Sequence, residues 1–284
     1  MTTLKDVMKD SLLRIGELHN GTATGGSATT LVDSGLKGRD EDWQYGTLFI
    51  DSAGSAAPEG EFAEVTAYTR SSGTLTVAAS ALTVAPAATD EYSVSSPRFP
   101  MDVVKQQVNF ALRQLGEIPL EDETLSTVAS QTEYTLPSGV SDRNLAQVLV
   151  SQLSTSGDRR KRQLLDWYAR PDGILVFRSQ PDSGMEITLM YMGAHPALTA
   201  YGSTLSEFVH TELASSATAY WLLKQKKRRT AGVSAEQVDE LNDAAVDFMN
   251  AKKMYPIPRL AKPWKPILTR KGERPNKHGP WLVS

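Results

Sequence analysis

Two segments with helical periodicity enclose a segment with strand periodicity, and this order constrains the fold more than any other feature. Residues 3–15 repeat Leu, Met and Ile at helical spacing, and Gly16 follows, where a left-handed residue can close the helix. A second helical stripe begins at Pro100, which suits a first turn, and stops at Gly116 and Pro119. Residues 20–98 between them are rich in Gly, Ser, Thr and Ala. The sequence therefore predicts a β module inserted between two helices.

The inserted segment contains five short runs in which apolar and polar residues alternate, with Gly and Pro between the runs. This pattern predicts antiparallel strands, and so many strands in about eighty residues favour a small barrel or sandwich. We expect Tyr68, Phe49 and Val77 to point inward, since each lies in an alternating run. The runs are TTLVD, GTLFID, EFAEVTAYTR, GTLTVA and EYSVS.

The second half of the chain repeats the change from strands to helices. Five further strand-like runs separated by turn residues predict a meander of hairpins over 125–202. Thr204 with Glu207, and Ser234 with Gln237, each have the spacing of a capping box and predict the starts of two helices.

The fold class that follows is α+β. We expect a helical bundle core with an inserted small antiparallel β-barrel or sandwich, a second β-hairpin meander and an extended C-terminal arm. The predicted division is a helical core from residues 1–19, 99–124 and 203–254, an inserted β module at 20–98, a meander at 125–202 and the arm at 255–284.

The predicted arm has an unusual composition. It holds six of the fifteen prolines, two of the five tryptophans and seven Lys or Arg against one Glu. Proline excludes regular helix and favours extended geometry of about 3.1 Å per residue. Large apolar side chains are uncommon in segments that stay disordered, so we expect them to anchor the arm on a partner. The predicted contact residues are Tyr255, Ile257, Leu260, Trp264, Ile267, Leu268, Arg270, Arg274 and Trp281.

A second candidate surface is the basic run that ends the first of the two later helices. Cations are favoured there by the helix dipole, and a solvated helix end is one interpretation. Contact with phosphates or with an acidic protein surface is the other. The residues are Lys224, Lys226, Lys227, Arg228 and Arg229.

Several kinds of chemistry find no support in the sequence. There is no cysteine, and the four histidines form no metal-binding pair. GTATGG at 21–26 lacks the Lys of a phosphate loop, and DEDW at 40–43 lacks the order of a calcium loop. His195 is expected to be a satisfied loop residue. We expect no catalytic residue, metal or cofactor, no enzyme activity and no membrane span.

The order of elements and several stretches resemble the head-to-tail adaptor, or connector, proteins of tailed bacteriophages. The stretches are ALRQLGEIP, TEYTLPSGV, WYARPDGILVF and GMEITLMYMGAHPAL. The resemblance covers nearly the whole chain, although the 20–98 insertion varies in such proteins. It implies a structural protein of the virion neck, assembled in the host cytoplasm as a homo-oligomeric ring of twelve subunits. The arm would dock on the portal protein, other faces would meet tail or neck proteins, and DNA would pass through the channel during ejection without sequence-specific binding.

Two other functions stay open at this point. A nucleic-acid-binding protein could use the basic run and the arm as basic extensions. A host-recognition module could bind glycan through the Gly/Thr-rich insertion, where Trp43 and Tyr45 are the close aromatic pair.

Overall fold

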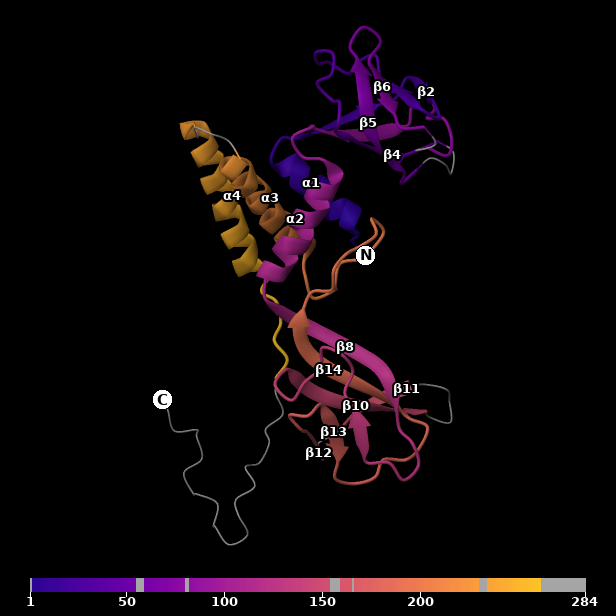
Figure 1. The fold of residues 1–284 in the computed structure, drawn as a ribbon, viewed down its shortest axis with the longest axis vertical. Coiled ribbons are helices and arrows are strands. Elements are labelled where there is room, and N and C mark those ends of the chain that lie inside the picture. Colours follow the sequence, from indigo (N-terminus) through magenta and orange to yellow (C-terminus); the bar gives the residue numbers. More distant parts are fainter. Residues whose placement is uncertain are drawn as a thin grey trace. The chain divides into compact units, whose positions relative to one another are not determined.

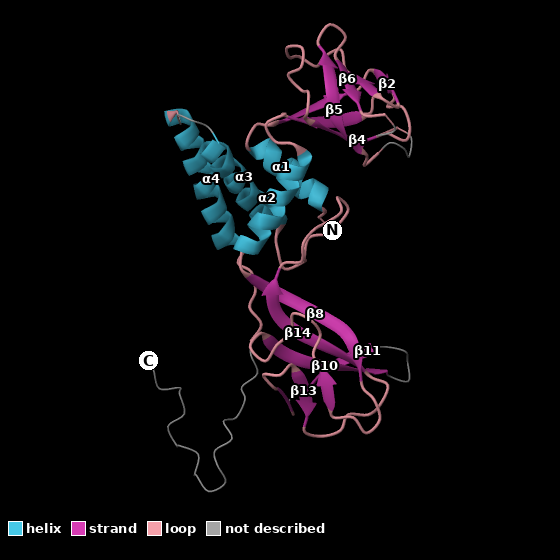
Figure 2. Cartoon of the chain, viewed as in Figure 1, coloured by secondary structure: helices cyan, strands magenta, loops and turns pink. Residues whose placement is uncertain are grey.

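The computed structural model describes residues 2–54, 59–79, 82–153, 159–164, 166–229 and 234–261. This part of the chain is mixed α and β, with four helices and antiparallel sheets (Figures 1 and 2). It divides into two compact units, Met1–Ile118 with Ala194–Pro258, and Pro119–Gly193 with Arg259–Ser284. The predicted four-part division stays a prediction. The helical part predicted to reach residue 124 gives way to a strand at Glu117.

The first unit contains the four helices. They are α1 (Leu4–Arg14), α2 (Met101–Gln114), α3 (Thr211–Arg229) and α4 (Ala235–Met254). α3 packs against each of the other three (Figure 1). Besides Leu213, Leu222 and Leu223, its buried residues have small side chains, which allow close approach of the neighbouring helices. These are Ala214, Ser215, Ser216, Ala217, Thr218 and Ala219.

The helix boundaries follow local chemistry. Thr3 and Asp6 form a capping box at the start of α1, and Gly16, with φ of 67°, ends that helix as predicted. Pro100 precedes α2, and Ser234 with Gln237 caps α4, so these two predictions are confirmed.

The predicted start of α3 at Thr204 is wrong. Thr204 forms a bridge with Thr3, and Leu205 donates its amide hydrogen to the carbonyl oxygen of Thr2. Their backbone groups are therefore committed to the N-terminal segment. The helix begins seven residues later, where His210 Nδ1 accepts a hydrogen bond from the amide of Glu212 at 3.2 Å.

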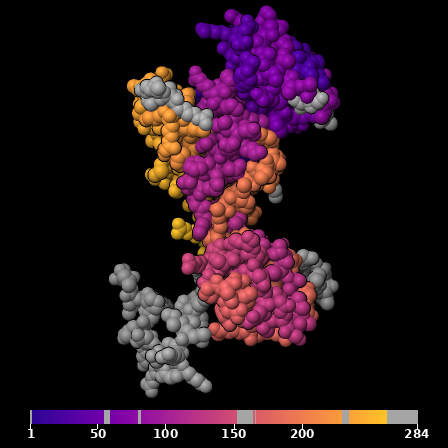
Figure 3. Space-filling view, in the orientation of Figure 1, coloured from indigo at the N-terminus to yellow at the C-terminus, as the bar shows by residue number. Residues whose placement is uncertain are grey.

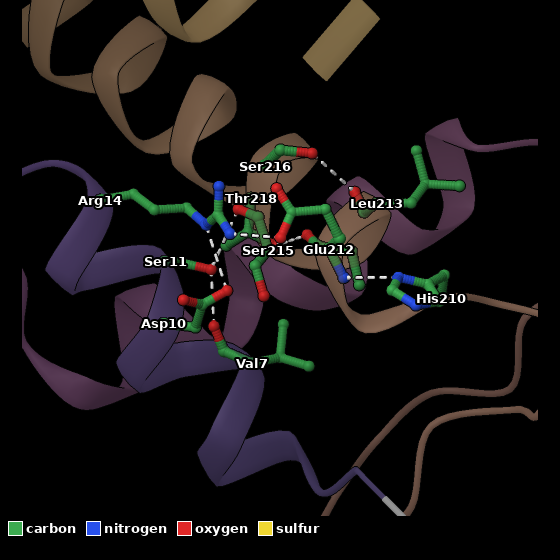
Figure 4. A network of polar contacts seen from close by, with 11 residues as sticks. Val7, Asp10, Ser11, Arg14, His210, Glu212, Leu213, Ser215, Ser216 and Thr218 are labelled. Carbon is green, nitrogen blue, oxygen red and sulfur yellow. Dashed lines mark hydrogen bonds and ion pairs between the residues drawn. The ribbon is translucent and has the colours of Figure 1, made fainter. Parts of the chain in front are cut away.

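Polar contacts join α1 to α3 (Figure 4). Ser11 donates to the carbonyl oxygens of Val7 and Ser215, at 2.6 and 3.2 Å. Arg14 donates through Nε to Asp10 and through Nη2 to Glu212, at 3.1 and 2.6 Å. The C-terminal half of α1 is thus fixed against the start of α3 by charge-assisted hydrogen bonds.

The inserted segment forms a seven-stranded sheet in the order β1-β7-β4-β5-β6-β3-β2. The five predicted strands are confirmed. In the described residues this sheet is not closed into a barrel, which was one of the two predicted forms, a small barrel or a sandwich. Two further strands, β1 and β2, were not predicted, and they include parts of the GTATGG stretch. The strands are β1 (Leu18–Thr22), β2 (Gly25–Ser27), β3 (Thr30–Val32), β4 (Thr47–Ser52), β5 (Phe62–Thr69), β6 (Thr74–Val77) and β7 (Glu91–Ser95).

The sheet is buried on both faces at β4. Leu48 and Ile50 belong to the apolar cluster that also holds Tyr68 and Val77. Phe49 is fully buried but lies outside that cluster, because successive side chains of a strand point to opposite faces. All three predicted inward residues are therefore buried, although Phe49 packs on the other face from Tyr68 and Val77.

The second unit is built from two antiparallel sheets around one apolar cluster, instead of one continuous meander. Trp167, Leu175 and Ile187 are among the buried residues of that cluster. The Asp172-Gly173 turn is confirmed, with Gly173 at φ of 82° between β12 and β13. The strands are β8 (Glu117–Ser126), β9 (Glu133–Thr135), β10 (Leu145–Leu153), β11 (Arg159–Leu164), β12 (Trp167–Ala169), β13 (Ile174–Phe177) and β14 (Glu186–Ala194). Their orders are β11-β10-β14-β8 and β12-β13-β9.

Candidate partner-binding surfaces

The predicted basic surface at the end of α3 is partly occupied by contacts within the chain. Lys224 Nζ lies 4.3 Å from the centre of the Trp221 ring and 3.3 Å from the hydroxyl of Tyr220. Lys226 Nζ lies 3.1 Å from Glu17 Oε1. Two of the five predicted cations thus have internal partners. Of the remainder, Lys227 is half-buried, Arg228 is exposed, and the side chain of Arg229 lies outside the described residues.

An aromatic cluster beside this surface was not predicted. Trp221 meets the ring of Phe110 edge-on at 4.8 Å, and Tyr220 stacks on Phe248 at 6.0 Å. The cluster joins α2, α3 and α4, and its rings are only half-buried. The sequence signal was the aromatic pair Tyr220 and Trp221, which two leucines separate from the basic run. Without the fold, however, the partners on α2 and α4 could not be assigned.

The start of the predicted arm is held by a ring stack. Tyr255 follows the last residue of α4, and its ring lies parallel to that of His210, with 3.8 Å between the ring centres. Its amide donates to the carbonyl oxygen of Ala251 at 2.9 Å. Ile257 and Leu260, also predicted arm contacts, are half-buried. The other predicted arm residues lie outside the described residues; these are Trp264, Ile267, Leu268, Arg270, Arg274 and Trp281.

His195 is a buried, hydrogen-bonded histidine, as predicted. Nδ1 lies 2.7 Å from the carbonyl oxygen of Pro196 and therefore donates, while Nε2 accepts from the amide of Ser206 at 3.2 Å. Burial lowers the pKa of His195, partly offset by the hydrogen bond to Pro196. The neutral ring thus ties the strand exit to the segment that leads into α3.

An acidic cleft of about 640 Å³ lies between α1 and the β1–β7 edge of the inserted sheet. Asp6, Asp10, Asp51 and Glu91 line it, and Lys9 Nζ crosses to Asp51 at 2.5 Å. Asp6 and Asp10 are one helical turn apart in α1, but Asp51 and Glu91 are far from them in sequence, so no local pattern could have predicted the cleft. Within the described residues, no group of three His, Asp or Glu is arranged to hold a metal ion.

The two loop motifs that sequence analysis set aside have structural roles. Gly21 lies in β1 beside Tyr92 and Asp33, and a Cβ there would come within 2.6 and 2.7 Å of their side chains. Asp40 and Asp42 accept hydrogen bonds from the backbone amides of Arg70 and Arg39.

Comparisons with known proteins add no assignment. No protein-family model matches the chain, and no curated protein matches its sequence. Among the helices in the described part, none has the length and apolar character that crossing a membrane requires.

Proposed function

We propose that this protein is a head-to-tail adaptor of a tailed-bacteriophage virion, a non-catalytic ring subunit that docks on the portal through its C-terminal arm. In this proposal the four helices are the adaptor core, around a channel through which DNA passes. The open β insertion and the two-sheet second unit are the parts that vary or meet tail and neck proteins. Twelve copies per ring is the stoichiometry that the resemblance implies.

The observation that carries the proposal is the start of the arm. The stack between Tyr255 and His210 fixes the point at which the chain leaves α4. Beyond Ala261 the sequence carries six Lys or Arg, one Glu and two tryptophans. A fixed origin followed by an extended segment with aromatic anchors suits recognition by pockets on a partner. Repetition around a ring would add avidity, because each further arm binds in an intramolecular step.

Binding to a purified portal protein provides the test. We expect native mass measurement to show a multi-copy complex of full-length protein on the portal ring. A variant ending at Met254 should fail to join, and so should a variant ending at Ala261, which keeps the Tyr255 stack. Trp264→Ala and Trp281→Ala should each weaken binding by about 30-fold, the typical effect of an interface hot spot.

A matched control separates specific docking from charge attraction. Arg270→Ala with Arg274→Ala removes charge and keeps both anchors, so it should slow association and reduce its salt dependence more than it shortens the lifetime of the complex. If the variant ending at Ala261 binds the portal as well as the full chain does, the proposed role of the arm is wrong.

The alternative, nucleic-acid binding, loses support from the internal partners of Lys224 and Lys226. It predicts DNA binding whose affinity falls steeply with salt. Such binding by the full chain, together with no association with the portal, would replace the adaptor proposal.

A further inference from the structure

One flank of α4 is acidic and exposed. Glu236, Glu240, Asp243 and Asp247 are spaced by four, three and four residues, which places them along one side of the helix. All four are exposed, and none forms an ion pair within the described part of the chain. Like charges at this spacing destabilise an isolated helix, so the stability of α4 itself does not explain this row of acids.

The acidic flank borders a groove with an apolar floor. The groove has a volume of about 280 Å³ and lies between the end of α1, α3 and α4. Glu240, Asp243 and Asp247 form its acidic side, while its floor includes Ile15, Ala219, Leu223 and Ala244. The one cation in its lining, Arg14, is already paired with Asp10 and Glu212. The groove therefore offers net negative charge beside apolar surface.

α4 buries few of its side chains against the rest of the chain. Of its twenty residues only Ala251 is buried, and Val246 and Met249 are 56% and 53% exposed. Figure 3 shows α4, in orange, as part of the molecular surface. Helices in proteins derive most of their stability from packing an apolar face, so a helix with so little burial is suited to further contact.

The same unit carries a basic groove on α2. Its volume is about 490 Å³, and Lys105 and Arg113 line it together with the amides of Gln106, Gln107 and Asn109. Among the residues that the structure describes, no carboxylate lines it. The single acid of α2, Asp102, lies in the first turn, where it complements the helix dipole. Neither Lys105 nor Arg113 forms an ion pair within the described residues, and the ring contact of Lys105 is long, with Nζ 5.4 Å from the centre of the Tyr201 ring.

These two grooves share no lining residue and lie against different neighbours of α3. One is bounded by α1, α3 and α4, and the other by α2 and the segment at His195–Ala197. A contact between the two acidic grooves would be repulsive, and so would a contact between the two basic ones. A contact between the acidic groove of one copy and the basic groove of the next is attractive at both sides.

We infer that the occupant of the acidic α4 groove is the basic α2 face of a second copy of this chain. Such a heterologous contact leaves each copy with one further groove free, so it repeats from copy to copy and can close into a ring. The inference rests on the proposed ring, and it adds which two faces of the subunit form the contact between neighbours.

The absence of cysteine from the chain allows a direct test by cross-linking. Ala244→Cys and Gln106→Cys place one thiol in each groove and leave every charge in place. Treated with a short bis-maleimide, a mixture of the two variants should give about tenfold more covalent dimer than either variant alone. A chain with both substitutions should give a ladder of multimers. Ser72→Cys, exposed on the β insertion, replaces Ala244→Cys in the control mixture, which should give only background.

Charge reversal supplies the second measurement. Asp243→Lys with Asp247→Lys makes the α4 groove basic, and Lys105→Glu with Arg113→Glu makes the α2 groove acidic. Each folded variant alone should associate about a hundredfold more weakly than the natural chain, because both sides of the contact now have one sign. An equimolar mixture should regain association, because every contact in an alternating assembly again joins opposite charges. Native mass measures both, and circular dichroism confirms the helix content of each variant.

The outcomes separate this inference from the proposed function. If both charge variants still form a multi-copy ring on the portal, or if cross-links form only between identical variants, the inferred contact is wrong while the adaptor proposal stands. If the cross-linked ladder forms but the full chain ignores the portal, the subunit contact stands and the adaptor proposal fails. The inference is overturned if no cross-link forms above the Ser72→Cys background. It is also overturned if the groove binds an unrelated basic protein in place of a second copy.

Discussion

Removing the hydroxyl of Tyr92 from the core of the β insertion should lower the free energy of unfolding more than removing the hydroxyl of Tyr68 from the same core. Tyr92 is 1% exposed and donates a hydrogen bond to Asp33 Oδ2 at 2.7 Å. Tyr68 is 3% exposed and donates to the carbonyl oxygen of Leu36 at 2.9 Å. The two tyrosines thus differ mainly in whether the acceptor is a side-chain carboxylate or a backbone carbonyl.

The magnitudes follow from that difference. A hydrogen bond to a charged group contributes about 1.5–3 kcal/mol to stability, whereas a neutral one contributes about 0.5–1.5 kcal/mol. Tyr92→Phe also leaves Asp33 Oδ2 without its buried donor, while Oδ1 keeps its bond from the amide of Gly35. We therefore expect Tyr92→Phe to lower the free energy of unfolding by about 2 kcal/mol and Tyr68→Phe by about 1 kcal/mol.

Urea unfolding followed by circular dichroism, with amide exchange in β4 and β7, measures both variants. The midpoint should shift with no change in the dependence on denaturant. Burial raises the pKa of Tyr92 above its ordinary value of 10.0, and the hydrogen bond to Asp33 is the second largest cause of this increase. The folded state then keeps this proton where the unfolded state loses it, so stability is fully present below pH 10.0 and falls as the pH rises above it. Tyr92→Phe should lack that part of the alkaline loss. Equal destabilisation by the two variants would refute the reasoning.

Three further predictions concern the first unit. The lowered pKa of His195 means that the unfolded state binds the proton first, so stability should be complete above pH 6.5 and fall as the pH drops below it; His195→Gln should flatten this dependence in urea midpoints measured across that range. Gly21→Ala should lower the free energy of unfolding by about 1–3 kcal/mol, because its Cβ would overlap Tyr92. Gly202→Ala has open space around its Cβ and should change the free energy of unfolding by less than about 0.5 kcal/mol. Similar shifts of the melting temperature for both variants would contradict the close packing around Gly21. Tyr255→Ala should remove a ring contact of about 0.5–1.5 kcal/mol and speed amide exchange in the last turn of α4, and unchanged exchange there would show that the stack with His210 does not hold the arm.

Local patterns predicted most elements of the fold. The apolar stripe of α2, the left-handed Gly16 and the capping box at Ser234 are all set by residues within a few positions of one another. They were confirmed because such interactions form inside one element. The alternation in β4 likewise predicted burial of Phe49, but not which face of the sheet it would occupy.

Features that depend on distant partners could not be predicted. Thr204 has the spacing of a helix cap, yet its backbone pairs with Thr3, about two hundred residues earlier. β1 has the sequence LHNGT, in which Thr22 is the single β-branched residue, and its strand is formed by pairing with β7. The same limit applies to the candidate surfaces. The basic run was visible in the sequence, but the contact of Lys226 with Glu17, and the two grooves of opposite charge, exist only once the helices pack.

The pairing of β1 with β7 has a consequence for how such a chain can change over evolution. Leu18 is the partner of Ser95, so the strands that enter and leave the insertion are neighbours, about 4.8 Å apart. The insertion between them therefore begins and ends at neighbouring positions. A different cassette with adjacent ends could be exchanged at this position while the register of α1 against α3 is kept. The junction therefore allows the insertion to be exchanged as a unit without altering the packing of the helices.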